Sequence, residues 1–230
     1  MGTTISYLRP DGKNVDGYLA DPKGGANAPG IVIIQEWWGV NDQIRGVAER
    51  LASAGYRAFV PDLYRGKSTV EAEEAHHLMS GLNFVDAASQ DIRGAVQFLK
   101  KNHGKVGVAG FCMGGALTLL ALSMAPEIDA GVVWYGCPPL EYIDATRIKA
   151  PLQGHWATQD EFFKIASIDQ LEEKLRAANV SYEFYRYLAH HAFANETAVG
   201  PHRIPQTQYD AVWSQQAWDR TFRFLGRWLG

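Results

Sequence analysis

The chain has 230 residues, of which 47% are hydrophobic and 20% charged, the composition of a globular protein that can bury a full core. Its net charge of −3 gives no reason to expect nucleic acid or an anionic membrane as a partner. No apolar run approaches the roughly 18 residues of a membrane span, and Met1 to Pro10 lacks the apolar core of a signal peptide. We therefore expect a cytoplasmic protein with a small-molecule substrate, a single domain over residues 1–230, and a monomer or weak homodimer.

Strands and helices alternate from the amino terminus onward. A hairpin is expected from strands at 5–8 and 15–20, because Pro10-Asp-Gly12 between them suits a tight reversal. Asn41 or Asp42 can cap the first helix, and Gly55 can end it. The elements expected after the hairpin are a strand at 31–35, a helix from about 42 to 54, a strand at 56–60, and helices at 70–79 and 87–102.

The same alternation continues to the carboxyl terminus. The expected elements are strands at 105–109, 130–135, 151–156 and 182–187, and helices at 116–123, 168–179 and 209–229. Strands that alternate with helices require a parallel sheet with helices on both faces, so the fold class is α/β. Ligands of such sheets bind outside the carboxyl ends of the strands.

A glycine-rich turn at 110–115 joins a predicted strand to a buried helix. Gly110-Phe-Cys-Met-Gly114 has the spacing of G-x-S-x-G with cysteine in place of serine. Such a nucleophile elbow needs glycines where a Cβ would collide with the strand or helix, and the helix start favours a thiolate. The alternative is that Cys112 is a small buried hydrophobe. Neither G-x-G-x-x-G nor a P-loop sequence is present, which disfavours nucleotide binding.

Candidate reactive residues follow the predicted strands. Cys112, Asp160 and His191 stand in the chain order nucleophile, acid, histidine of one hydrolase architecture. Glu36 follows the first buried strand among apolar neighbours, so its carboxylate should be buried and need a partner. The adjacent His190 leaves the choice of histidine open on spacing alone.

Four motifs resemble the dienelactone hydrolase family of α/β-hydrolases. They are Gln35-Glu-Trp-Trp-Gly-Val40, Pro61-Asp-Leu-Tyr64, Gly110-Phe-Cys-Met-Gly-Gly115 and Tyr187-Leu-Ala-His-His-Ala-Phe193. The resemblance implies the α/β-hydrolase fold with a mostly parallel central sheet. It also implies that Cys112 is the nucleophile, with His191 as base and Asp160 as acid, and that Glu36 holds the resting thiol.

The resemblance also guides the remaining site residues. The expected oxyanion donors are the backbone N–H groups of Trp37 and Met113. The side chains expected to contact substrate are those of Trp38, Tyr64, Tyr135, Phe193 and Asn195.

Two positions depart from the family pattern. The dienelactone-cleaving members bind a substrate carboxylate with two arginines, whereas this chain has Asn195 at one of those positions and no arginine over 70–81. A carboxylate bound without arginine loses a strong charge-assisted pair, which puts the dienelactone substrate in doubt.

No cofactor and no metal are expected. Four of the histidines outside the proposed triad lack acidic or cysteine neighbours at the spacing of metal ligands. They are His76, His77, His155 and His202.

Three functions compete. The first is a cysteine hydrolase of a small ester or lactone, similar to carboxymethylenebutenolidase and acting through an acyl-enzyme. The second is a broader carboxylesterase or thioesterase with an apolar acyl pocket, for which the indoles of Trp37, Trp38, Trp134 and Trp156 are suited. The third is a non-catalytic binding protein that senses oxidation through Cys112.

Overall fold

One sheet of eight strands runs through the part of the chain that the structure describes. The structure is a computed structural model and describes residues 2–25, 27–102, 104–201 and 203–230. The strands are β1 (Thr3–Leu8), β2 (Asn14–Ala20), β3 (Gly30–Ile34), β4 (Arg57–Pro61), β5 (Val106–Phe111), β6 (Ala130–Trp134), β7 (Leu152–Ala157) and β8 (Tyr182–Tyr187). Their order in the sheet is β1-β2-β4-β3-β5-β6-β7-β8. The predicted strands are therefore confirmed, with ends that differ by one or two residues.

The sheet is mostly parallel. Strands β3 to β8 pair in parallel, while β1 and β2 form an antiparallel hairpin whose second strand pairs antiparallel with β4. Strand β3 lies at the centre, and all of its residues are buried, because parallel strands are covered on both faces. The carboxyl ends of the parallel strands meet at one edge, where the predicted reactive residues follow.

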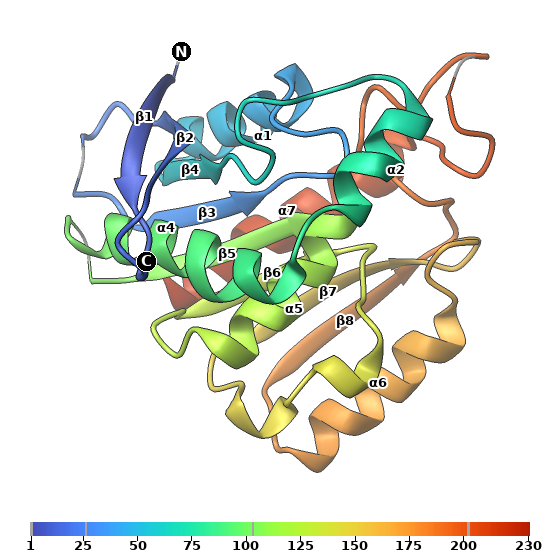
Figure 1. The fold of residues 1–230 in the computed structure, drawn as a ribbon. Coiled ribbons are helices and arrows are strands. Elements are labelled where there is room, and N and C mark those ends of the chain that lie inside the picture. The colour runs from blue at the N-terminus through green and yellow to red at the C-terminus, as the bar shows by residue number, and fades with distance from the viewer. Residues whose placement is uncertain (1, 26, 103, 202) are drawn as a thin grey trace.

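Helices cover both faces of the sheet (Figure 1). They are α1 (Asp42–Ser53), α2 (Ala72–Ser80), α3 (Phe84–Asp86), α4 (Arg93–Lys100), α5 (Met113–Met124), α6 (Ile165–Ala177) and α7 (Ala211–Trp228). The apolar faces of α1 and α7 share one core with the sheet, and those of α4, α5 and α6 share the other. Helix α5 is buried along its whole length except at its last residue, so both its start and its direction are fixed by packing.

The first helix forms as predicted. The side chain of Asn41 accepts a hydrogen bond from the backbone N–H of Ile44, 3.1 Å away, which satisfies one of the unpaired donors of the first turn. Gly55 follows the end of the helix with a φ of +99°, a conformation that glycine adopts without strain.

The helix predicted over 87–102 is interrupted. The structure divides this region into a π-helix η1 (Ala87–Ile92) and α4, and the short α3 precedes them. Within η1, Asp91 is buried and bonded to Arg9 and Arg65, which come from the distant β1–β2 turn and the loop after β4. Sequence periodicity cannot anticipate such long-range partners. The short 3-10 turns η2 (Leu140–Tyr142) and η3 (Ala145–Arg147) were not predicted either.

Within the described residues, the structure contains no helix with the length and apolar character that crossing a membrane requires.

Candidate active site

The turn between β5 and α5 holds Cys112 in a strained conformation. Its φ of +54° and ψ of −117° lie outside the regions that side-chain-bearing residues usually occupy. A Cβ on Gly110 would lie 2.0 Å from the carbonyl oxygen of Gly114, and one on Gly114 would lie 2.3 Å from that of Ile34. The two glycines are therefore required by close backbone approach, as the elbow motif predicts.

A chain of hydrogen bonds connects the thiol to an aspartate. His191 Nε2 lies 3.1 Å from Cys112 Sγ, and His191 Nδ1 lies 2.7 Å from Asp160 Oδ2. Both His191 and Asp160 are buried. The structure thus brings together the cysteine, histidine and aspartate that the sequence singled out from the ends of β5, β8 and β7. His190, which spacing alone did not separate from His191, is half-buried and has no part in this chain of hydrogen bonds.

Electrostatics favour the charged form of the His191 imidazole. Burial alone would lower the pKa of His191, but the negative charge of Cys112 and the hydrogen bond with Asp160 outweigh it and raise this pKa to about 10. A charged imidazole within hydrogen-bond distance of a thiol attracts the negative charge that the sulfur gains when it loses its proton. The arrangement can therefore activate a thiol as a nucleophile.

The loop after β7 fixes the aspartate. The second carboxylate oxygen of Asp160 accepts hydrogen bonds from the backbone N–H groups of Phe162 and Phe163, at 2.8 Å and 2.9 Å. The two phenylalanine rings also pack against the imidazole of His191, with ring centroids 5.0 Å and 5.6 Å away. Sequence reasoning missed this pair, although an aspartate that accepts from backbone N–H groups two and three residues later forms a common Asx turn.

Glu36 does not hold the thiol. Its buried carboxylate accepts hydrogen bonds from Asn195 Nδ2 at 2.7 Å and from the Tyr135 hydroxyl at 3.3 Å, whereas Cys112 Sγ faces His191. The expectation that Glu36 restrains the resting thiol is therefore wrong for this conformation. The physical reason is that neutral donors in the segments after β6 and after β8 satisfy the buried carboxylate.

Burial and neighbouring polar groups act in opposite directions on the pKa of Glu36. Desolvation raises the pKa of Glu36, opposed by the charge of His191 and by the donors Asn195 and Tyr135. Asn195 is itself oriented by Thr197, whose backbone N–H and hydroxyl donate to the amide oxygen at 2.9 Å and 2.7 Å. Thr197 was not among the predicted site residues, since nothing in its local sequence marks it.

The start of α5 lies against the end of β3. The short distance that a Cβ on Gly114 would make with Ile34 shows how closely the two segments approach. Met113 opens α5, where backbone N–H groups have no partner within the helix and the helix dipole is positive. Trp37 follows β3 in the loop beside it. The backbone N–H groups of Trp37 and Met113 must lie close together to bind one oxyanion, and this approach of the two segments is compatible with that requirement.

A cavity of about 1140 Å³ opens over the thiol. Cys112, His191 and Glu36 line it, and so do the predicted contact residues Trp38 and Asn195. Its wall also includes segments of 69–72, 137–142 and 198–207 that sequence reasoning did not assign to the site.

Three predicted substrate contacts lie behind this cavity and do not line it. The hydroxyl of Tyr64 is buried 3.3 Å from the sulfur of Met113. Tyr135 and Phe193 are fully buried, with ring centroids 5.3 Å apart, and the Tyr135 backbone has a φ of +36°. Position after a strand predicts the edge of the sheet but not the direction of the side chain, which is why these three assignments are wrong.

The described residues contain no cluster of histidine, cysteine, aspartate and glutamate that could hold a metal ion. His155 is buried in hydrogen bonds with Tyr187, Gln153 and Thr221, and burial lowers its pKa to about 3. His155 is therefore a neutral structural residue. His202 lies outside the described residues.

Known proteins are similar to this chain in sequence. The dienelactone hydrolase family model matches residues 15–229. Protein usf of Aquifex pyrophilus is 34% identical over 241 residues, which cover the whole of both chains. A protein of Methylorubrum extorquens, provisionally named carboxymethylenebutenolidase, is 32% identical over 225 residues that cover 90% of this chain and 74% of that protein.

Several solved structures are similar to this chain in fold. A dienelactone hydrolase-like promiscuous phosphotriesterase from metagenomic libraries has a TM-score of 0.85 at 22% identity, covering 100% of this chain and 99% of that one. An esterase of Pyrococcus furiosus has a TM-score of 0.73 at 20% identity, covering 100% of this chain and 93% of that one. With its sheet order and the strained turn between β5 and α5, the chain has the α/β-hydrolase fold. It belongs to the dienelactone hydrolase family of carboxylic ester hydrolases.

Proposed function

We propose that this protein is a cysteine hydrolase that cleaves a carboxylic ester or lactone through a thioester acyl-enzyme. The observation that carries the proposal is the hydrogen-bonded chain from Cys112 Sγ through His191 to Asp160, at 3.1 Å and 2.7 Å. A thiol beside a histidine that a carboxylate orients is the arrangement that covalent acyl transfer needs.

In the first half of the reaction, the thiolate of Cys112 attacks the ester carbonyl carbon. The carbonyl oxygen becomes an oxyanion, which the backbone N–H groups of Trp37 and Met113 stabilise. The C–O bond of the ester then breaks, and His191 gives its proton to the leaving alkoxide. Asp160 holds the imidazole in the orientation that places Nε2 toward the thiol. For a lactone, the leaving oxygen stays attached to the acyl group.

In the second half, water hydrolyses the thioester. Neutral His191 takes a proton from the water molecule, whose oxygen attacks the acyl carbon from the side that the leaving group vacated. Collapse of the second oxyanion breaks the C–S bond, releasing the carboxylic acid and restoring the thiolate and imidazolium.

The test compares single and double variants. Hydrolysis of p-nitrophenyl acetate should fall by roughly three orders of magnitude or more in Cys112→Ala and in His191→Ala, and hardly further in the double variant, because triad members act as a unit. Additive losses would overturn the assignment of Cys112 and His191 to one mechanism.

Cys137 provides the matched control. Its thiol donates to the carbonyl oxygen of Pro138, and burial raises its pKa to about 12, so it stays protonated at neutral pH. Cys137→Ala should therefore keep activity within about threefold of the parent. Loss of activity in Cys137→Ala with retention in Cys112→Ala would refute the proposed nucleophile, and an inactive parent enzyme would favour the non-catalytic thiol sensor.

A further inference from the structure

The cavity over Cys112 is far larger than attack on a small lactone requires. Its volume of about 1140 Å³ lies slightly above the roughly 300–1,000 Å³ of ligand pockets and exceeds what a compact substrate fills. The question that the volume raises is which part of a larger substrate it receives. The answer below rests on the proposed function, since it assumes that an ester is cleaved at Cys112.

Apolar side chains line the cavity along α5, beginning beside Cys112, and this part of the cavity is called the branch along α5. Met113, Ala116 and Leu120 line it from α5, and their spacing of three and four residues places them on one face of that helix. Met79 on α2 and Phe84 on α3 line the cavity as well. From Met113 to Leu120 the helix rises about 10 Å, which matches an extended acyl chain of on the order of eight carbons.

Charge in the cavity is unfavourable for an anionic substrate. Among the described residues that line it, Glu36 and Glu71 carry carboxyl groups, and Arg203 and His191 are the basic residues. Both ring nitrogens of His191 are engaged, with Asp160 and Cys112. Two nitrogens of Arg203 donate to the carbonyl oxygens of Thr207 and Gly200, at 2.7 Å and 3.2 Å, so its guanidinium is engaged in its own loop. A substrate carboxylate would enter without the bidentate partner that makes such groups bind well.

The mouth of the cavity is apolar too. Val70, Val85, Tyr142, Phe162 and Val199 line it and are all exposed, although large apolar side chains are usually covered. Apolar side chains gathered around one opening are typical of a ligand-binding surface. They provide a path by which an apolar chain leaves water before it reaches the branch along α5.

We propose that the site is specific for neutral esters with a linear, medium-length alkyl acyl group. The acyl chain lies along the face of α5 that Met113, Ala116 and Leu120 form, opposite Met79 and Phe84. The carbonyl carbon then lies at Cys112, where α5 begins. The leaving alcohol faces the mouth of the cavity.

A chain-length series tests this specificity. kcat/KM is measured for p-nitrophenyl acetate, butyrate and octanoate, with p-nitrophenyl hydrogen succinate as the carboxylated counterpart of butyrate. Burial of one methylene favours binding about fourfold in the ideal case, so octanoate should exceed acetate by at least about tenfold. Butyrate should exceed the succinate ester.

Variants that fill the branch locate the chain. Ala116→Phe should lower kcat/KM for octanoate by about tenfold or more and for acetate by less than about threefold, because only the longer chain reaches this position. Leu120→Trp should act in the same direction and serves if Ala116→Phe fails to fold. Val212→Phe is the matched control, since Val212 is exposed on α7 and does not line the cavity.

The outcomes separate the two proposals. A kcat/KM that falls from acetate to octanoate overturns the acyl specificity while leaving the cysteine hydrolase intact, as does an equal loss for both esters in the two folded variants. A preference for the succinate ester over butyrate also overturns it. Failure of the parent enzyme to cleave any of the four esters defeats the proposed function itself.

Discussion

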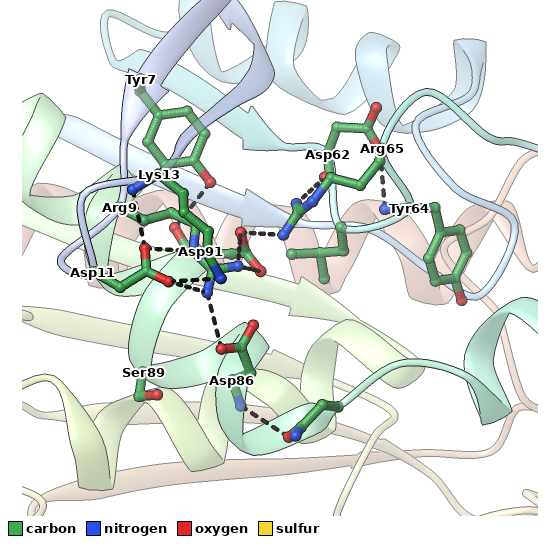
Figure 2. A network of polar contacts seen from close by, with 12 residues as sticks. Tyr7, Arg9, Asp11, Lys13, Asp62, Tyr64, Arg65, Asp86, Ser89 and Asp91 are labelled. Carbon is green, nitrogen blue, oxygen red and sulfur yellow. Dashed lines mark hydrogen bonds and ion pairs between the residues drawn. The ribbon is translucent and has the colours of Figure 1, made fainter.

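Two buried carboxylates in this molecule have opposite kinds of partners. Asp91 in η1 is held by arginines: Arg9 donates to it at 3.3 Å and Arg65 at 2.8 Å (Figure 2). Glu36 at the active site is held by the neutral donors Asn195 and Tyr135. In both carboxyl groups burial raises the pKa, opposed chiefly by the arginines for Asp91 and by His191 for Glu36.

The two carboxylates have different roles: Asp91 helps to hold the fold together, and Glu36 belongs to the candidate active site. Arg9 also bonds to Asp11 and Asp86, so one guanidinium joins the β1–β2 turn to α3 and η1 (Figure 2). Such a network of full charges fixes the position of elements. At the active site, the histidine is the only cation that the structure shows beside the described carboxylates of Glu36 and Asp160, and it can give up its proton. Changes in the two regions should therefore affect different measurements.

The largest effect is expected at His191, the histidine proposed to act as the catalytic base. His191→Ala should lower kcat by roughly three orders of magnitude or more with little change in the midpoint of thermal unfolding. His190→Ala is the adjacent control and should retain most of the activity. Similar losses in both variants would show that the pair acts through local structure and not through His191 alone.

The opposite pattern is expected for the arginine network. Arg9→Met should lower the free energy of unfolding by about 3 kcal/mol, because it leaves buried Asp91 with a single arginine partner. The kcat of the folded enzyme should stay within about threefold. Urea denaturation measures the first quantity and a steady-state assay below the transition the second.

Lys13→Met is the control for this prediction. Lys13 is exposed and pairs with Asp11 at the surface, so its loss should cost less than about 1 kcal/mol. If Lys13→Met destabilised the protein as much as Arg9→Met, burial would not be what gives the network its strength.

A smaller effect is expected when an arginine is introduced beside Glu36. Asn195→Arg should shift the ratio of kcat/KM toward a carboxylated ester by roughly 1–2 kcal/mol relative to its uncharged counterpart, the scale of a hydrogen bond to a charged group. Asn195→Gln retains a neutral amide and is the matched control. A parent enzyme that already prefers the carboxylated ester about a hundredfold would contradict the account.

The smallest expected effect is a change in the pKa of His191 when the thiol of Cys112 is removed. In Cys112→Ala the pKa of His191 should fall below about 10, because the negative charge that raises it is gone while burial, which lowers it, remains. The imidazole proton signals in an NMR pH titration report this directly. An unchanged pKa would mean that Asp160 alone holds the proton on His191.

Much of the architecture could be predicted from local sequence. Buried parallel strands read as apolar runs, and helix ends carry recognisable caps such as Asn41. Because the carboxyl ends of these strands share one edge, residues that follow them were expected to meet, and Cys112, Asp160 and His191 do.

What could not be predicted depends on partners far away in the chain. The π-helix around Asp91 depends on Arg9 and Arg65, and the partner of Glu36 was decided by an asparagine that lies 159 residues later. Tyr135 was predicted at the correct edge but points behind the cavity, since side-chain direction depends on a backbone φ of +36°. The apolar branch along α5 arises from helices that pack together, and no local motif marks it.

The central claim is that Cys112 carries the acyl group during turnover. The measurement is peptide mass spectrometry of enzyme mixed with p-nitrophenyl butyrate and quenched in acid within the first turnovers, when a thioester intermediate accumulates if its hydrolysis is slow. The account predicts a butyryl adduct on the peptide that contains Cys112 and none on the peptide that contains Cys137. An adduct on Cys137, or on a residue other than Cys112, would contradict it.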